Sequence, residues 1–174
     1  MLASVLQDPT VVTLATLVRD LAFVVHAGGI AAFALMAALS ARVGGPPTAQ
    51  VLRIYRGFGP GLGVSLGLTI FGALLAHYGT VGAFSWGTDA ATGGWAGLLA
   101  WMVFFVAWVS NIQLEVWTLE PLRKLDPEGT GHATDAAGLD HATRRVIRHL
   151  GVQAGLWGLI VVLARFATTT MASA

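Results

Sequence analysis

The chain has 174 residues, of which 55% are hydrophobic and only 11% are charged, whereas a typical soluble domain has about 25% charged residues. So little charge does not suit a water-soluble surface, and the aliphatic and aromatic content excludes a disordered chain. The absence of cysteine excludes disulfides and thiolate chemistry, and a net charge of +1 gives no reason to expect a nucleic acid partner. The composition therefore predicts an integral membrane protein.

Four segments are apolar over the roughly 20 residues that a helix needs to cross a hydrocarbon layer about 30 Å thick. None has the strict alternation of a barrel strand. We therefore expect an all-α integral membrane protein with four transmembrane helices in an up-down bundle, forming a single membrane domain over residues 1–174. The expected spans are 21–41, 57–78, 95–117 and 145–166.

Two of the expected helices have recognisable start signals. Asp8 and Pro9 show the pattern of an N-cap followed by a first-turn proline, so we expect residues 8–20 to form an interfacial helical extension of the first span. The longest connection runs from Pro121 to Asp140, and Asp140 is the expected N-cap of the fourth helix.

The cations are distributed unevenly between the two ends of the predicted bundle. Most of the ten Lys and Arg residues flank the first-to-second and third-to-fourth connections, and only Arg19 and Arg165 lie at the opposite end. The positive-inside rule then predicts cytoplasmic basic loops, with both termini outside, in the plasma (inner) membrane. The residues at the basic end are Arg42, Arg53, Arg56, Arg123, Lys124, Arg144, Arg145 and Arg148.

Glycines recur at four-residue spacing in the second and fourth spans, as Gly59, Gly63 and Gly67 and as Gly151 and Gly155. Helices in lipid associate through close backbone approach at small residues. We therefore interpret these glycine stripes as helix packing faces.

Short connections favour up-down connectivity, which makes the first and fourth helices neighbours. Asp20 and Arg165 then fall on the same outer rim. We expect these two side chains to approach each other.

Two histidines are predicted near the outer face on antiparallel helices. His26 lies near the outer start of the first span and His77 near the outer end of the second. Facing histidines are the axial ligands of a low-spin b-type haem, and Ala22 and Ala73 leave a small-residue hollow beside them. His26 and His77 are therefore the candidate cofactor-binding and metal-ligating residues, while separate interfacial histidines remain the alternative.

A second polar group is predicted near the cytoplasmic face. Asn111 and Glu115 share a face of the third span, and three residues share a face of the fourth, namely Arg145, His149 and Gln153. We expect Glu115 to lie opposite Arg145 or His149, and Asn111 near Gln153. Such a cluster could relay protons or bind a quinone headgroup, although interhelical hydrogen bonding alone explains the same pattern.

Several short motifs together suggest a family. They are His26-Ala-Gly-Gly in the first helix, a glycine-rich second helix, a Trp-rich third helix followed by Glu120-Pro121-Leu122, and Arg144-Arg145 opening the fourth. The chain resembles the CopD-like copper-resistance domain and, more distantly, the haem-binding membrane protoporphyrinogen oxidases. The resemblance implies that His26 carries a ligand, either copper or haem iron.

Three functions are consistent with these features. The first is a subunit of a larger redox-linked membrane complex that ligates one b-type haem or related pigment and takes part in electron transport. The second is a CopD-like copper transport or handling protein, and the third is a purely structural accessory or anchor subunit. We do not expect a stand-alone enzyme, because no nucleophile–base pair or complete metal site is visible, and the expected partners are lipid and other membrane subunits.

Overall fold

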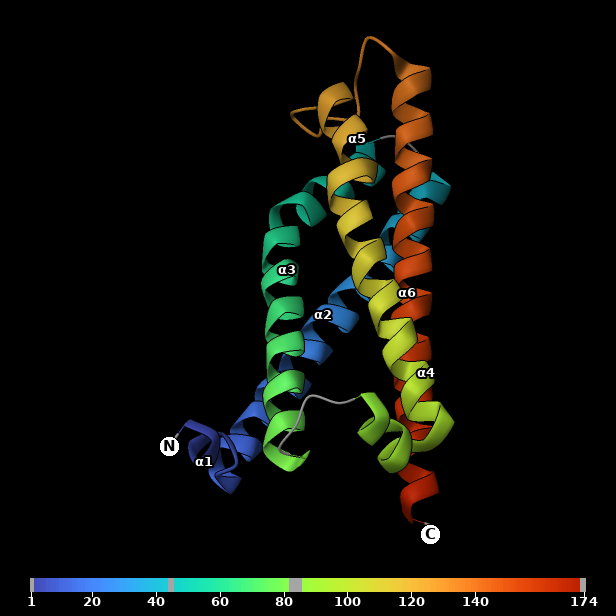
Figure 1. Cartoon of the computed structure of the whole chain (residues 1–174). Helices are drawn as coiled ribbons and strands as arrows, with labels where there is room; N and C mark the ends of the chain where they lie inside the picture. Colours follow the sequence, from blue (N-terminus) through green and yellow to red (C-terminus); the bar gives the residue numbers. More distant parts are fainter. Residues whose placement is uncertain (1, 44–45, 82–85, 173–174) are drawn as a thin grey trace.

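The computed structural model describes residues 2–43, 46–81 and 86–172, and every regular element in these ranges is helical. Figure 1 shows α1 and the last turns of α6 at one end of the bundle, with α5 and the linker 126–135 at the other. In chain order the elements are α1 (Leu2–Leu6), α2 (Pro9–Val43), α3 (Pro46–Val81), α4 (Trp86–Gln113), the π-helix η1 (Leu114–Thr118), α5 (Leu119–Leu125) and α6 (Ala136–Ala172).

Four helical stretches of the described chain are long and apolar enough to cross a membrane. Only 22% to 33% of the residues in their most apolar windows are buried inside the protein, so most of this apolar surface faces outward, where lipid would cover it. The expected all-helical, four-span, multi-pass membrane fold is therefore confirmed. The four stretches are Pro9–Val43, Thr48–Thr80, Leu98–Leu125 and Ala136–Ala164.

The first long helix begins where its capping signal predicts. The Thr10 amide donates to Asp8 Oδ1 at 2.8 Å, and Pro9 occupies the first helical position. The helix then continues for 35 residues, or about 52 Å at 1.5 Å per residue. It is thus well over a bilayer core in length, as the sequence predicts.

The predicted start of the fourth helix is wrong. Gly138 N–H donates to Asp135 Oδ1 at 2.8 Å, so Asp135 supplies the N-terminal cap and α6 begins at Ala136. Asp140 lies inside the helix, where it forms an i,i+4 ion pair with Arg144. The linker is also shorter than expected, because the chain stays helical through Pro121 to Leu125.

Helix α2 packs against both α3 and α6, and α4 packs against α6 (Figure 1). The contact between α2 and α6 confirms that the first and fourth spans are neighbours. Asp20 Oδ1 accepts a 2.8 Å hydrogen bond from Arg19 Nε. The Arg165 side chain lies outside the described part of the structure, as does its predicted approach to Asp20.

The predicted glycine packing faces are largely open. A Cβ added at Gly63, Gly67, Gly151 or Gly155 would meet no atom within 4 Å. A four-residue stripe turns by about 40° per step around a helix, so it leaves the contact face within two steps. Gly59 alone of the α3 stripe is buried, and it faces a side chain rather than another backbone.

Candidate functional site

His26 lies on the inward face of α2 and is 0% exposed. Its Nδ1 is 2.7 Å from the Leu62 carbonyl oxygen of α3. A carbonyl oxygen only accepts hydrogen bonds, so Nδ1 carries the proton and Nε2 carries the lone pair. Among the residues that the structure describes, no group hydrogen-bonds to the buried Nε2. His26 therefore presents a fixed tautomer with one unsatisfied acceptor.

One aromatic ring lies against this imidazole, and two more lie against that ring. The His26 and Trp157 ring centroids are 4.8 Å apart with the planes at 72°, so the contact is edge-on. Phe23 and Phe104 each lie 5.7 Å from Trp157, also edge-on. The free Nε2 thus lies in apolar surroundings, where an unsatisfied polar atom carries a free energy cost.

The imidazole belongs to a polar layer that joins four helices. Trp157 Nε1 donates to Gln153 Oε1 at 3.1 Å within α6, and Gln153 Nε2 donates to the Ala107 carbonyl of α4 at 3.1 Å. With the bond from His26 to Leu62, the layer connects α3, α2, α6 and α4. Sequence reasoning missed Trp157, although its i,i+4 spacing from Gln153 places the two on one helix face.

His77 does not lie beside His26. It follows Leu62 by fifteen positions on α3, which is about 22 Å along the helix axis from the His26 level. At the His77 end, Gly79 packs against Val12, so the facing part of α2 is the segment near residue 12. The predicted joint ligation of one iron by both histidines does not fit this arrangement, because His26 faces the Leu62 level of α3 and the His77 level faces a much earlier part of α2.

The inner polar cluster divides into two separate groups. In the first, His149 Nε2 lies 2.9 Å from the Ser110 carbonyl oxygen and His149 Nδ1 lies 2.9 Å from Thr118 Oγ1. The carbonyl accepts from Nε2–H, which leaves Nδ1 as the acceptor for the threonine hydroxyl. Neither Ser110 nor Thr118 was a predicted site residue, and no sequence periodicity indicates them.

In the second group, Glu115 faces α3 instead of α6. Tyr55 Oη donates to Glu115 Oε1 at 3.2 Å, and Arg123 Nη2 donates to Oε2 at 3.2 Å. Gly59 leaves room for the carboxylate, since a Cβ there would lie 3.1 Å from Oε1. The predicted pairing of Glu115 with Arg145 or His149 is therefore wrong.

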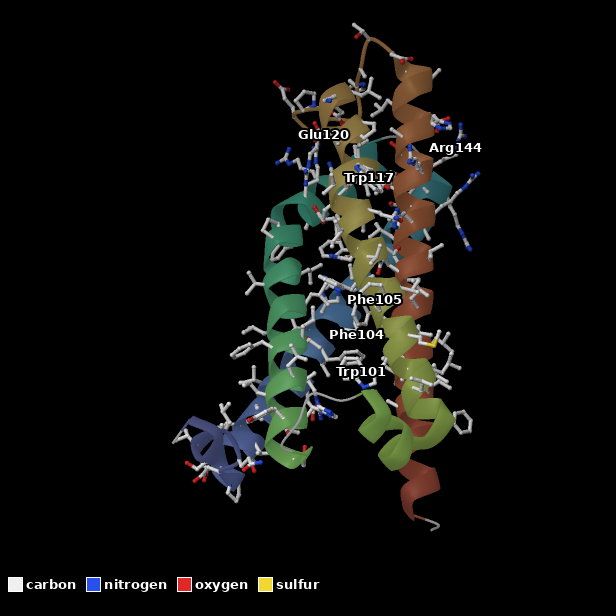
Figure 2. All side chains as sticks on the ribbon, viewed as in Figure 1. Trp101, Phe104, Phe105, Trp117, Glu120 and Arg144 are labelled. Atoms are coloured by element: carbon white, nitrogen blue, oxygen red, sulfur yellow. The ribbon has the colours of Figure 1, made fainter. Side chains whose placement is uncertain are left out.

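The π-helix η1 explains the division. Its wider turn closes with a bond from the Leu119 N–H to the Leu114 carbonyl, one residue longer than an α-helical bond. The extra residue rotates the following chain, so Thr118 reaches α6 while Glu115 points toward α3. Figure 2 shows Trp101, Phe104, Trp117 and Glu120 in succession along this run of helices, from the end near the termini to the end near α5.

The two remaining members of the predicted cluster take no part in these contacts. Arg145 is exposed on α6. Asn111 is buried on α4, but Gln153 bonds to Ala107, one turn before it. Gln153 thus lies about one helical turn from the level of Asn111, and its hydrogen bond goes to the main chain.

Comparison of the chain with protein-family models, curated proteins and solved structures finds no match. Within residues 2–43, 46–81 and 86–172, no three His, Asp or Glu side chains gather closely enough to hold a metal ion between them. The candidate site therefore consists of the free Nε2 of His26 and the Trp157 ring against the imidazole, with Phe23 and Phe104 packed on that tryptophan.

Proposed function

We propose that this chain is a small multi-pass membrane subunit that holds one b-type haem through His26 Nε2. The observation that carries the proposal is the orientation of the His26 ring, with Nδ1–H bound to the Leu62 carbonyl and Nε2 buried without a partner among the residues that the structure describes. Metal-ligating histidines characteristically donate their other ring N–H to a carbonyl or carboxylate, which fixes the ring and raises its basicity. A metal bound at Nε2 would also satisfy the free acceptor.

The side chains near His26 are apolar, as the surroundings of a haem are. Phe23, Phe104 and Trp157 would have to move apart to admit a porphyrin, because His26 is 0% exposed, and Leu62 keeps the imidazole in the ligating tautomer. A bound haem would supply one-electron chemistry, and its reduction potential would depend on the low polarity of these surroundings. The iron would be ligated by His26 alone, and His77 would take no part.

Electron transfer requires a donor and an acceptor, so the proposal includes other membrane subunits as partners. The open glycine faces of α3 and α6, around Gly63 and Gly155, offer flat surfaces that support this view. The basic end of the bundle would face the cytoplasm, in accordance with the distribution of cations.

The test is a visible spectrum of the full chain purified from membranes supplied with haem. We expect a Soret band and reduced-minus-oxidised bands in the wild type and in His77→Ala, and at least a tenfold loss of haem in His26→Ala. His77→Ala is the matched control, because it removes a histidine from a different level of the same bundle. A featureless spectrum of the wild-type protein would refute haem binding.

The same free nitrogen also supports a second candidate, a CopD-like copper-handling protein, which the sequence resemblance implies for His26. Elemental analysis of the same three preparations separates the two candidates. Copper bound in proportion to protein and lost in His26→Ala, without haem bands, would favour copper handling. Neither metal in any preparation would leave the structural anchor subunit as the remaining function.

A further inference from the structure

A cavity of about 450 Å³ lies at the end of the bundle away from the termini. Parts of α2, α3, α5, the linker and α6 form its walls. Its apolar surface consists of alkyl side chains such as Leu52 and Leu122. Its polar residues include Thr48, Arg56, Asp126 and Arg144.

Thr48 gives this cavity an unsatisfied polar atom. The residue is 5% exposed, and its Oγ1 has no hydrogen-bond partner among the described residues. Threonine hydroxyls inside helices usually bond to a carbonyl one turn earlier, as Thr69 does with Ser65. Thr48 lies in the first turn of α3, so the helix provides no such carbonyl. The hydroxyl is closed off from solvent in its present rotamer, and a turn of the side chain to another rotamer would bring it to a ligand in the cavity.

The charges that line the cavity are balanced. Arg56 and Arg144 supply two cations, and Asp126 and Asp140 supply two carboxylates. Arg56 uses Nη1 to donate to the Asp126 carbonyl oxygen at 3.0 Å, which leaves most of its five N–H donors available. This balance suits a zwitterion better than a ligand with net negative charge.

The two carboxylates have different roles. Asp126 accepts hydrogen bonds from the Thr130 and Gly131 amides, both at 2.9 Å, and so fixes the linker wall. Asp140 forms an ion pair with Arg144, in which both side chains are more than half exposed. Exposed pairs of this kind are weak, so Asp140 and Arg144 can separate to receive a cationic and an anionic group.

The cavity lies at the depth where the membrane spans end. Thr48 is the first residue of one span, Leu122 is near the end of another, and Leu139 is near the start of a third. Arg144 lies at this same end of the molecule, close to the level of Glu120 (Figure 2). In a bilayer this level coincides with the lipid headgroups. A phospholipid is therefore the source of zwitterions that has direct access.

We propose that this cavity binds the headgroup of a phospholipid that carries a phosphodiester and a primary ammonium. Arg56, Arg144 and Thr48 donate to the phosphate oxygens, Asp140 accepts from the ammonium, and the alkyl wall covers the glycerol end. A quaternary ammonium fits less well, because proteins recognise it with aromatic cages and the described residues of the cavity wall include no Phe, Tyr or Trp.

The experiment is native mass spectrometry of the full chain in detergent, titrated with phosphatidylethanolamine, phosphatidylglycerol or phosphatidylcholine of identical acyl chains. We expect about tenfold tighter binding of phosphatidylethanolamine than of the other two, since each difference removes a charge-assisted hydrogen bond. Thr48→Val and Arg144→Gln should each weaken the binding of phosphatidylethanolamine about fivefold to tenfold. Arg145→Gln, an identical charge change on the next residue and outside this cavity, should leave it within about twofold.

Three outcomes would overturn the proposal. They are equal binding of the three lipids, equal effects of Arg144→Gln and Arg145→Gln, or equally tight binding of soluble glycerophosphoethanolamine, which would show that the ligand is a free headgroup. Circular dichroism checks that each variant is folded. Arg144 is at the exposed rim, so Arg144→Gln keeps the test valid if Thr48→Val does not fold.

Discussion

Gly72 of α3 lies directly against the main chain of α2, where an added Cβ would come within 2.8 Å of the Ala15 carbonyl oxygen. The Arg19 amide nitrogen would be 2.9 Å from the same Cβ. Both neighbours are backbone atoms, which cannot move aside as a side chain can. This contact brings α2 and α3 together, although Gly72 is outside the four-residue glycine stripe.

The first prediction follows from this contact. Gly72→Ala should lower the free energy of unfolding by about 1–3 kcal/mol, because the helices must separate to admit the methyl group. Gly67→Ala is the control, since its Cβ would enter open space. It should change stability by less than about 0.5 kcal/mol or raise it slightly through helix propensity. Unfolding by denaturant in micelles, followed by circular dichroism, measures both, and equal losses would contradict the assignment of the contact.

The second prediction concerns the polar layer around His26. Gln153→Leu removes the acceptor of the indole N–H of Trp157, a residue that is 1% exposed. We expect a loss of about 1–3 kcal/mol, the usual consequence of leaving a buried donor unpaired. Gln50→Leu makes the same chemical change at an exposed position and should have little effect. Tryptophan fluorescence during unfolding reports both, and an unchanged Gln153→Leu midpoint would count against the layer.

The third prediction tests the bond between Thr118 and His149. Thr118→Val keeps the side-chain shape but removes the hydroxyl that bonds Nδ1, so we expect a loss of about 1 kcal/mol. Thr13→Val removes a local bond to Pro9 on an exposed surface and should cost less. A double-mutant cycle with His149→Phe isolates the pair. Additive effects of the two substitutions would mean that the contact contributes nothing.

The sequence predicts the spans and the neighbouring helices because both follow from runs of apolar residues and short connections. It does not predict which levels of two neighbouring helices face each other. The second span is predicted from residue 57, but α3 begins at Pro46, and His26 faces Leu62 instead of His77. Periodicity also cannot reveal the π-helix, because one extra residue in a turn has no compositional mark. The sequence therefore does not predict the hydrogen-bond partners of Glu115 and Thr118.

The last prediction concerns the acid sensitivity of the linker. Burial raises the pKa of the Asp126 carboxyl, but hydrogen bonds from Gly131 and Thr130 outweigh it and hold this pKa below the ordinary value. A lowered folded-state pKa means that the carboxylate stabilises the folded form above the unfolded pKa of about 3.9. This contribution is lost as the pH falls through the folded pKa.

Asp126→Asn should therefore lower stability at pH 7 by about 1–3 kcal/mol, and its difference from the wild type should shrink as the pH falls below about 4. Glu128→Gln removes a charge from an exposed position on the same linker and is the control. Urea unfolding in micelles at a series of pH values measures the free energy of unfolding of both variants and of the wild type. A difference that stayed constant with pH would show that Asp126 stabilises the linker by shape, independently of its charge.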